Sequence, residues 1–271
     1  MMINFKEKIL YGPSFQSARV EEHVLRLPAA CAGLAGRTLL FLSDVHLSKR
    51  FPAEAVEKLL FQIKSLQPDL ILMGGDYGES ADWQLQFFEM LSRIAPPLGI
   101  FGVLGNNDYE CFPERLTPLM EAAARAGVTL LIDRTVRIDT GCGCISIAGL
   151  NELRHAEPLK KPLFTGKDAS SLRILLAHYP QSIGRYLREH PVHAPHFAGA
   201  GHTHGGQFSL LGLTPYSIGF EFIMKGERLP LVSGWKQIRD TQLLVSPGLG
   251  TSRLPIRINV EPTIHRIQLS L

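Results

Sequence analysis

Cysteine is scarce in this sequence, with four residues among 271. Cys31, Cys111, Cys142 and Cys144 are too few and too scattered to form the disulfide framework of a secreted domain. The last two lie in the stretch GCGC, and no second cysteine pair joins them, so we expect a tight turn entering a strand rather than a zinc site. This cysteine usage is typical of a protein from a reducing, cytoplasmic compartment.

Long apolar runs are also lacking. No uninterrupted run reaches the ~18 residues that a membrane-spanning helix needs. The N-terminal stretch MMINFKEKILYGPSF has neither the apolar segment nor the small-residue cleavage site of a signal peptide. We therefore expect a cytoplasmic protein that is soluble or at most peripheral to the inner membrane.

Linkers, repeats and a strong charge are absent as well. No Pro/Ser/Gly tract, charge block, low-complexity run or internal repeat divides the chain. We expect one domain over residues 1–271, with an N-terminal lead-in at 1–36 and an insertion at 208–240 that covers the substrate. The formal net charge of +3 is too small to suggest a nucleic-acid partner, and it disfavours a nuclease.

Short apolar runs that end in polar, glycine-containing loops predict buried strands. The first half alternates such strands with stretches whose apolar residues recur at helical spacing. The strands are expected at 37–46, 68–76 and 98–108, and the helices at 52–66, 82–94 and 113–126. This order predicts an α/β fold with a largely parallel sheet. The second half has many short strands and one helix at 181–189, so two packed sheets flanked by helices are expected.

Two histidines lie close together in the stretch GAGHTHGGQF. In an extended segment, residues i and i+2 point to the same side, so His202 and His204 can face one target. Neutral imidazole is the commonest protein ligand for a transition metal. Alone, this stretch is more typical of an ordinary polar loop, and the metal interpretation depends on partners elsewhere in the chain.

Five predicted strands end in segments that carry metal-ligand side chains: SDVH, GGD, GNND, AHYP and GHTHGG. Ligands bind beyond the carboxyl ends of strands in such sheets. The candidates are Asp44, His46, Asp76, Asn106, His178, His202 and His204. Each has an alternative role, as a turn residue for the carboxylates and Asn106 or as a core histidine for His178. Their coincidence at five strand ends favours the metal interpretation.

Seven nitrogen and oxygen ligands suit two divalent ions ~3.5–4 Å apart. The most economical division gives one ion Asp44, His46 and His204, and gives the other Asn106, His178 and His202. Asp76 and a water-derived hydroxide would bridge them. Two ions, two carboxylates and one hydroxide leave a charge of about +1, which attracts a phosphate group. Imidazole-rich ligation favours Mn, with Fe, Zn or Co as alternatives, over Ca or Mg.

The order DVH, GD, GNND, H and GHTH resembles the calcineurin-like metallophosphoesterase superfamily, whose pattern is D-x-H, G-D, G-N-H-[DE], H and G-H-x-H. The resemblance extends from about Arg37 to the C-terminus. It implies a four-layer α/β/β/α sandwich and a dinuclear site that hydrolyses phosphate esters, with its ligands at the seven positions above. The tail DTQLLVSPGLGTSRLPIRINVEPTI is similar to YkuE-like phosphodiesterases and to chlamydial-type UDP-2,3-diacylglucosamine pyrophosphatases of lipid A synthesis.

One position departs from the family pattern. The resemblance implies a catalytic histidine after Asn106, but this chain has Asn107 there, followed by Asp108, which would orient it. An amide donates a hydrogen bond to phosphate but cannot act as a general acid near neutral pH. The substitution therefore favours a good leaving group, such as the nucleotide released from a pyrophosphate, although neutral drift is an open alternative.

The segment 208–240 is rich in apolar residues and contains four basic ones, Lys225, Arg228, Lys236 and Arg239. Such a surface suits an acylated, phosphate-bearing substrate or an anionic membrane, although a buried strand with a surface loop is the alternative. Arg253 and Arg50 are expected to hold substrate phosphate.

Together these features predict a metal-dependent hydrolase that converts UDP-2,3-diacylglucosamine to lipid X and UMP. A broader phosphodiesterase or phosphomonoesterase is the alternative. A non-catalytic scaffold of the same fold is a remote one, because a scaffold has no need for four imidazole ligands.

Overall fold

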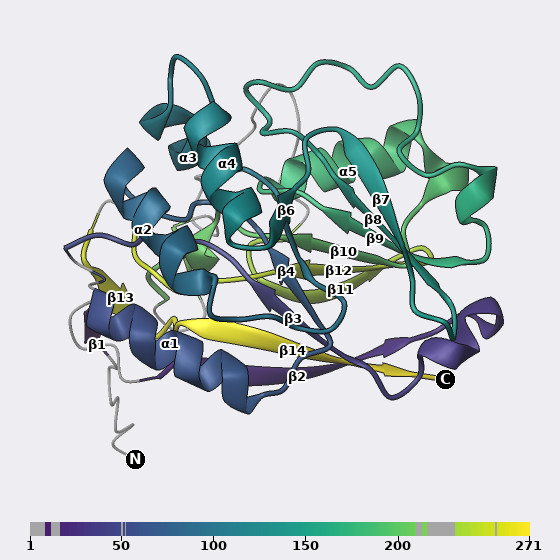
Figure 1. Ribbon diagram of the computed structural model, residues 1–271, viewed down its shortest axis with the longest axis horizontal. Helices are drawn as coiled ribbons and strands as arrows, with labels where there is room; N and C mark the ends of the chain where they lie inside the picture. The colour runs from purple at the N-terminus through teal and green to yellow at the C-terminus, as the bar shows by residue number, and fades with distance from the viewer. Residues whose placement is uncertain are drawn as a thin grey trace.

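Two six-stranded sheets pack face to face at the centre of the molecule (Figure 1). The computed structural model describes residues 9–11, 17–49, 51, 53–209, 213–215, 231–252 and 254–271. A short antiparallel pair, β1 (Ile9–Tyr11) with β13 (Ile256–Ile258), forms a third, two-stranded sheet.

The first large sheet has the strand order β2-β14-β3-β4-β5-β6. Its strands are β2 (Arg19–Arg26), β14 (Thr263–Ser270), β3 (Thr38–Leu42), β4 (Leu70–Met73), β5 (Ile100–Gly102) and β6 (Val128–Leu130). The four strands from β3 to β6 are parallel, and β14 runs antiparallel to β3. The predicted parallel β-α-β order of the first half is therefore confirmed.

The second large sheet has the strand order β11-β12-β10-β9-β8-β7. Its strands are β11 (Gly234–Ile238), β12 (Thr241–Val245), β10 (Phe197–Ala200), β9 (Ser171–Leu176), β8 (Cys144–Gly149) and β7 (Arg134–Asp139). The inner four strands are parallel, and the two edge strands are antiparallel to their neighbours.

Helices cover the outer face of each sheet. The main ones are α1 (Ala53–Ser65), α2 (Ala81–Leu91), α3 (Asn106–Cys111), α4 (Thr117–Arg125) and α5 (Pro180–Glu189). Short 3-10 turns lie at Ala29–Leu34, Gly166–Asp168, Pro191–His193 and His204–Gly206. In Figure 1, α5 lies on the side of the molecule opposite to α1.

The alternation of side chains along β3 builds two layers of the core at once. Leu39 and Phe41 point into the core between the two sheets, whereas Leu40 and Leu42 point into the core beneath α1, α2 and α4. A third core, which includes Ile183 of α5, covers the outer face of the second sheet. The result is the predicted four-layer α/β/β/α sandwich of two mixed sheets.

Three local features refine the predictions. The predicted lead-in contains a strand, because residues 19–26 form β2 at the edge of the first sheet. The helix expected at 113–126 is shorter, and α3 precedes it, since Asn106 already begins a helix. The GCGC stretch makes the predicted turn, in which Thr140 donates its backbone N–H to the carbonyl of Gly143 at 3.0 Å.

Among the helices of the described ranges, none is long and apolar enough to cross a bilayer. Of the predicted 208–240 insertion, residues 210–212 and 216–230 lie outside the described residues, including Lys225 and Arg228.

Candidate metal centre and active-site cleft

The seven candidate ligands all follow the carboxyl ends of parallel strands. Asp44 and His46 follow β3, Asp76 follows β4 and Asn106 follows β5 in the first sheet. His178 follows β9 in the second sheet. His202 and His204 follow β10 in that sheet. Because the two sheets pack against each other, these strand ends meet at one edge of the sandwich, and the side chains come together there.

Most of these residues have an unusual backbone conformation. Ten non-glycine residues of the described ranges have positive φ, and five of them are candidate ligands. They are Asp44 at 53°, His46 at 47°, Asp76 at 58°, His202 at 70° and His204 at 51°. Left-handed backbone is costly for residues other than glycine and clusters at functional sites. The loops are therefore shaped to direct side chains rather than to minimise local strain.

Two positions beside the candidate ligands have room only for glycine. A Cβ atom on Gly105 would overlap the carboxylate of Asp76, and one on Gly201 would overlap the side chains of Ser43 and Asp44. These contacts explain why the motifs combine glycine with a ligand, since any larger residue would displace a carboxylate.

The first ligand group is Asp44, His46 and His204, whose ligand atoms lie within 4.8 Å of one another. All three residues are buried, and His204 Nε2 lies 3.6 Å from Asp44 Oδ1. Asp44 is held in place by the Ser43 hydroxyl, which donates to its Oδ2 at 2.5 Å, and by the backbone N–H of His202 at 3.1 Å.

The second ligand group is Asn106, His178 and His202. Asn106 Oδ1 lies 3.1 Å from both His178 Nε2 and His202 Nδ1, and the two nitrogens are 3.2 Å apart. His178 Nδ1 lies 2.8 Å from the carbonyl oxygen of Gly74, which can only accept. The proton of a neutral His178 ring therefore resides on Nδ1, and the lone pair of Nε2 faces the other ligands, an arrangement that orients metal-binding histidines.

Asp76 lies between the two groups. Its Oδ2 is 3.5 Å from His46 Nε2 and 3.4 Å from His178 Nε2, and its Oδ1 accepts the backbone N–H of Asn107 at 2.9 Å. This is the position that a bridging carboxylate requires. Asp44 is also within reach of the second group, because Asp44, Asp76 and His178 form a further cluster of ligand atoms within 4.8 Å.

Buried charges shift the protonation of the cluster. Burial lowers the pKa of His178, but the negative charges of Asp76 and Asp44 outweigh it and raise the pKa to about 10. Burial and the positive charge of His178 lower the pKa of His202 to about 3. Burial and the neighbouring His46 hold the pKa of His204 well below its usual value. A protonated His178 thus balances the carboxylates, a charge that a cation supplies when it displaces the proton.

The donor set fits two divalent cations. With metal–nitrogen distances of ~2.0–2.1 Å, ligand atoms on one ion lie about 2.9–3.4 Å apart. The separations within the second ligand group fall in this range, and the His204 Nε2–Asp44 Oδ1 separation of 3.6 Å in the first is slightly longer. In addition, the buried His46 Nε2 has no hydrogen-bond partner within the described part of the chain. A buried nitrogen without such a partner fits a role as a metal ligand.

The side chains of Asn107 and Asp108 contact different parts of the site. Asn107 Nδ2 lies 3.0 Å from His46 Nδ1, so the amide touches the ring nitrogen opposite the ligand position. The fully buried Asp108 carboxylate accepts the backbone N–H groups of Asp76, Tyr77 and Gly105 at 2.7–3.1 Å. Asp108 was expected to orient Asn107, but these bonds fix the surrounding loops, so its influence on Asn107 passes through the backbone.

An open cleft of about 770 Å³ leads to the ligand groups. Its wall includes five candidate ligands and Asn107, together with polar residues that the sequence did not single out. Tyr179 is one of these: its ring lies 3.8 Å from that of His202, centroid to centroid, and its hydroxyl donates to Asn106 Oδ1 at 3.3 Å. Tyr179 belongs to the AHYP segment, and its position next to His178 was the one signal in the sequence that could have identified it.

Arg154 lies on the same cleft wall. Its Nε donates to Glu152 Oε1 at 3.1 Å and its Nη2 to Glu110 Oε1 at 2.9 Å. The Glu152 side chain is fully buried, whereas that of Arg154 is 39% exposed. Two carboxylates therefore hold a partly exposed guanidinium at the cleft, where it can contact an anion.

The two arginines predicted to bind substrate, Arg50 and Arg253, lie outside the described residues. The same tail motif instead places Arg257 beside the centre. Arg257 is buried, its Nε donates to the Gly250 carbonyl at 2.7 Å, and its Nη2 lies 3.2 Å from His204 Nδ1. Burial lowers the pKa of Arg257 to about 10. Sequence alone predicts an exposed arginine, so this contact could not be anticipated.

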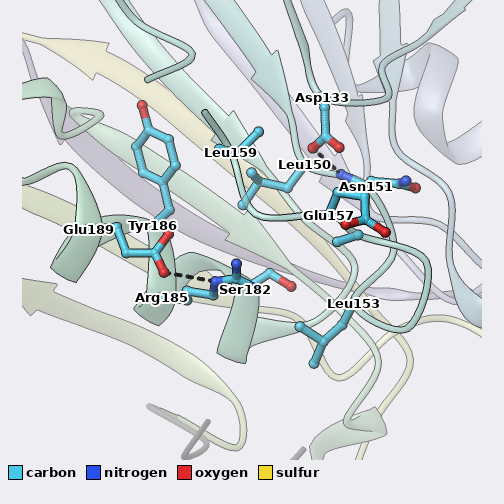
Figure 2. A pocket seen from close by; sticks show the side chains of 11 residues that line it. Asp133, Leu150, Asn151, Leu153, Glu157, Leu159, Ser182, Arg185, Tyr186 and Glu189 are labelled. Atoms are coloured by element: carbon cyan, nitrogen blue, oxygen red, sulfur yellow. Dashed lines mark hydrogen bonds and ion pairs between the residues drawn. The ribbon is translucent and has the colours of Figure 1, made fainter. Parts of the chain in front are cut away.

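A smaller pocket lies between α5 and the chain after β8 (Figure 2). Figure 2 shows Arg185 and Glu189 of α5 joined across its wall, where Arg185 Nε lies 3.0 Å from Glu189 Oε1. Its volume is about 30 Å³, enough for one or a few water molecules. It shares no lining residue with the cleft in the described part of the structure, so the cleft is the candidate substrate site.

The comparison with protein families agrees with this geometry. The family model of the calcineurin-like phosphoesterases matches residues 37–206. The chain therefore belongs to this family, and it is a metal-dependent phosphoester hydrolase. The family uses a dinuclear divalent metal centre.

Three relatives illustrate the range of the family. The chain is 26% identical to the metallophosphoesterase YkuE of Bacillus subtilis (90% of this chain and 82% of YkuE). It is 28% identical to the phosphodiesterase YaeI of Escherichia coli (85% and 81%). It is 25% identical to LpxG of Chlamydia muridarum, a UDP-2,3-diacylglucosamine pyrophosphatase (68% and 68%). The predicted resemblance to the YkuE-like and chlamydial proteins is thus confirmed.

Proposed function

We propose that this protein hydrolyses the pyrophosphate bond of UDP-2,3-diacylglucosamine, with lipid X and UMP as products. The observation that carries the proposal is Asn107, an amide beside the candidate ligands at a point where the family pattern has histidine. An amide cannot protonate a leaving oxygen near neutral pH. A nucleotide leaves as a stable anion without protonation, whereas a sugar or lipid alkoxide does not. The similarity to LpxG supports the same substrate.

The residues of the centre have separate tasks in this reaction. When bound, two divalent ions, of which we propose manganese, activate a water molecule and stabilise charge on the phosphate oxygens. The two ligand groups would hold these ions, and Asp76 lies between the groups. Asn107 can donate its N–H to a phosphate oxygen, while its neighbour Asp108 keeps the loops of Asp76 and Gly105 in register. Water adds across the P–O–P linkage, and each product keeps one phosphate.

The walls of the cleft suit both parts of the substrate. Arg154 offers a guanidinium to the second phosphate. The cleft also has apolar residues in its wall, namely Phe208, Pro215 and Leu254. Of these, Leu254 is 53% exposed. An apolar side next to a phosphate site is what an acylated sugar phosphate needs. We further propose that the protein is cytoplasmic and meets this substrate as a peripheral protein at the inner membrane.

The proposal is tested by supplying purified protein with Mn²⁺ and either the lipid nucleotide or bis-p-nitrophenyl phosphate. We expect UMP release from the lipid nucleotide with the higher kcat/KM. Arg154→Ala should lower kcat/KM for this substrate roughly 10- to 100-fold, the range for losing a charge-assisted hydrogen bond. Arg125→Ala, on the exposed end of α4, is the matched control. Turnover of the synthetic diester with no UMP release would overturn the proposal.

A broader phosphodiesterase is the second candidate, because YaeI carries that activity and matches 85% of this chain. The two differ in how activity responds to acyl chains. An acyl-specific enzyme should prefer the diacylated sugar nucleotide to UDP-N-acetylglucosamine by roughly 10-fold or more, since each buried methylene contributes ~0.8 kcal/mol. Equal rates on both would favour the broader activity.

A further inference from the structure

A second cluster of potential metal ligands lies within the first sheet, apart from the strand-end loops. Glu21 and His23 belong to β2, and His265 belongs to β14. The two strands are parallel neighbours, with His265 paired to Glu21 and Ile267 paired to His23. Residues two apart on a strand share a face, so all three side chains point to the same side of the sheet.

The ligand atoms of these three residues lie within 4.8 Å of one another. His23 Nε2 is 3.1 Å from His265 Nδ1, and Glu21 Oε2 is 3.8 Å from the same nitrogen. Two imidazoles on one cation lie about 2.9–3.4 Å apart. We propose that Glu21, His23 and His265 bind a third divalent cation, of the zinc type, at the edge of the first sheet.

Hydrogen bonding prepares His265 as a ligand. Its Nε2 lies 3.1 Å from the hydroxyl oxygen of Ser246, which also accepts the backbone N–H of Gly248 at 3.0 Å. When His265 donates Nε2–H to this oxygen, its lone pair lies on Nδ1, the atom that faces Glu21 and His23. Metal-binding histidines are commonly oriented by such a contact at the opposite ring nitrogen.

The protonation states agree with this geometry. Burial, and then the neighbouring His23, lower the pKa of His265 to about 3. Burial also lowers the pKa of His23, although Glu21 and Glu22 oppose the shift. Both rings are therefore neutral near pH 7, the form that binds metal. A cation would replace the proton that the two rings otherwise share.

The neighbours of His23 fix its ring and leave a route to solvent. The indole of Trp235 stacks on His23 with centroids 4.5 Å apart and an interplanar angle of 12°. The Glu21 side chain is 36% exposed, so an ion can enter from the sheet edge. Two imidazoles and one carboxylate with room for water are a common donor set for zinc.

A Ser–His–Glu arrangement also invites comparison with a nucleophilic triad. Ser246 has no exposed surface, and its oxygen holds the N–H of Gly248. A substrate carbonyl or phosphorus cannot reach it, whereas an ion can approach the cluster beside the Glu21 side chain, which is 36% exposed. The geometry therefore favours a cation over covalent catalysis.

The experiment measures zinc bound to the full chain after equilibration in a zinc buffer, by elemental analysis. Wild-type protein should retain three equivalents, and His23→Ala and the isosteric Glu21→Gln should retain two. Glu22→Gln is the matched control, because Glu22 neighbours both residues but forms an exposed ion pair with Arg266. It should retain three equivalents.

A second measurement separates this cluster from the dinuclear centre. In an Asp76→Asn background, zinc should still raise the unfolding temperature, and His23→Ala should make that rise smaller. Circular dichroism of the zinc-free variants checks that each is folded. The inference is overturned if folded His23→Ala and Glu21→Gln retain as many equivalents as wild type and show the same thermal response. These readouts do not involve turnover, so they stand apart from the proposed substrate.

Discussion

The strand-end centre and the Glu21–His23–His265 cluster bring similar donors together in opposite ways. In the centre, ligands come from the segments that follow five strands, and five of the seven have left-handed backbone. In the cluster, the ligands lie inside paired strands with regular register. Each left-handed residue costs of order 1–3 kcal/mol, whereas the pleat of a strand aligns i and i+2 at no cost. Loops allow the ligand side chains to point in many directions, whereas paired strands hold their side chains in fixed positions.

The largest difference between the two should appear when one histidine is removed from each. His204→Ala should lose one ion from the centre and lower kcat by roughly 10³-fold or more, because charge stabilisation in the transition state depends on both ions. His23→Ala should leave the centre's two ions in place. Metal analysis combined with turnover measures both effects. His193→Ala, on a short turn outside the ligand motifs, controls for loss of an imidazole. Full metal content with retained activity in His204→Ala would remove His204 from the ligand set.

A glycine substitution should sharpen the contrast between crowded loops and open surface. Gly105→Ala places a methyl group against the Asp76 carboxylate, so we expect a loss of ~1–3 kcal/mol in stability and roughly 10²-fold in kcat. The comparison is with Gly166→Ala, since no atom lies within 4 Å of a Cβ there and its φ is not left-handed. Chemical denaturation and steady-state kinetics provide the measurements. Similar behaviour of the two variants would show that the loop tolerates displacement of Asp76.

Both clusters have a polar side chain at the second nitrogen of one histidine, Asn107 at His46 and Ser246 at His265. Asn107→His should restore a general acid, so rates on poor leaving groups should rise roughly tenfold more than rates on good ones. A linear free-energy plot against leaving-group pKa, for wild type and variant, measures the change in slope. Parallel lines would show that Asn107 acts only through His46.

The smallest effect is expected at the stacking contact of the strand cluster. Trp235→Ala removes the indole that covers His23, and aromatic stacking contributes ~0.5–1.5 kcal/mol. Zinc affinity at the cluster should therefore fall about two- to tenfold, as measured by competition with a chelator. Phe61→Ala, at a side chain that is 77% exposed, is the control. An unchanged affinity would show that the strands alone fix His23.

The architecture could be predicted because apolar alternation and helical spacing are local signals. The same pattern placed polar residues just after strands, and parallel strands carry such residues to one edge. The helix α3 (Asn106–Cys111) could not be predicted, since six residues are too few to show a period. For this reason the GNND segment was expected to be the polar end of the strand at 98–108, whereas β5 ends at Gly102 and α3 begins at Asn106.

Contacts between distant strands were beyond the sequence. His23 and His265 are 242 positions apart, and nothing local to either marks the register that joins them. Arg154, Tyr179 and Arg257 were missed for the same reason, because their roles follow from the partners that the fold supplies. The motif residues were found because they follow the family pattern, whereas these residues lie outside it.

The division of ligands between the sheets has a mechanical consequence. Each of the two ligand groups takes side chains from both sheets: Asp44, His46 and Asn106 come from the first, and His178, His202 and His204 from the second. A bound cation would therefore connect the two sheets of the sandwich. A shift of one sheet relative to the other would change the distances between ligands from the two sheets. The apolar packing between the sheets therefore also fixes the geometry of the metal centre.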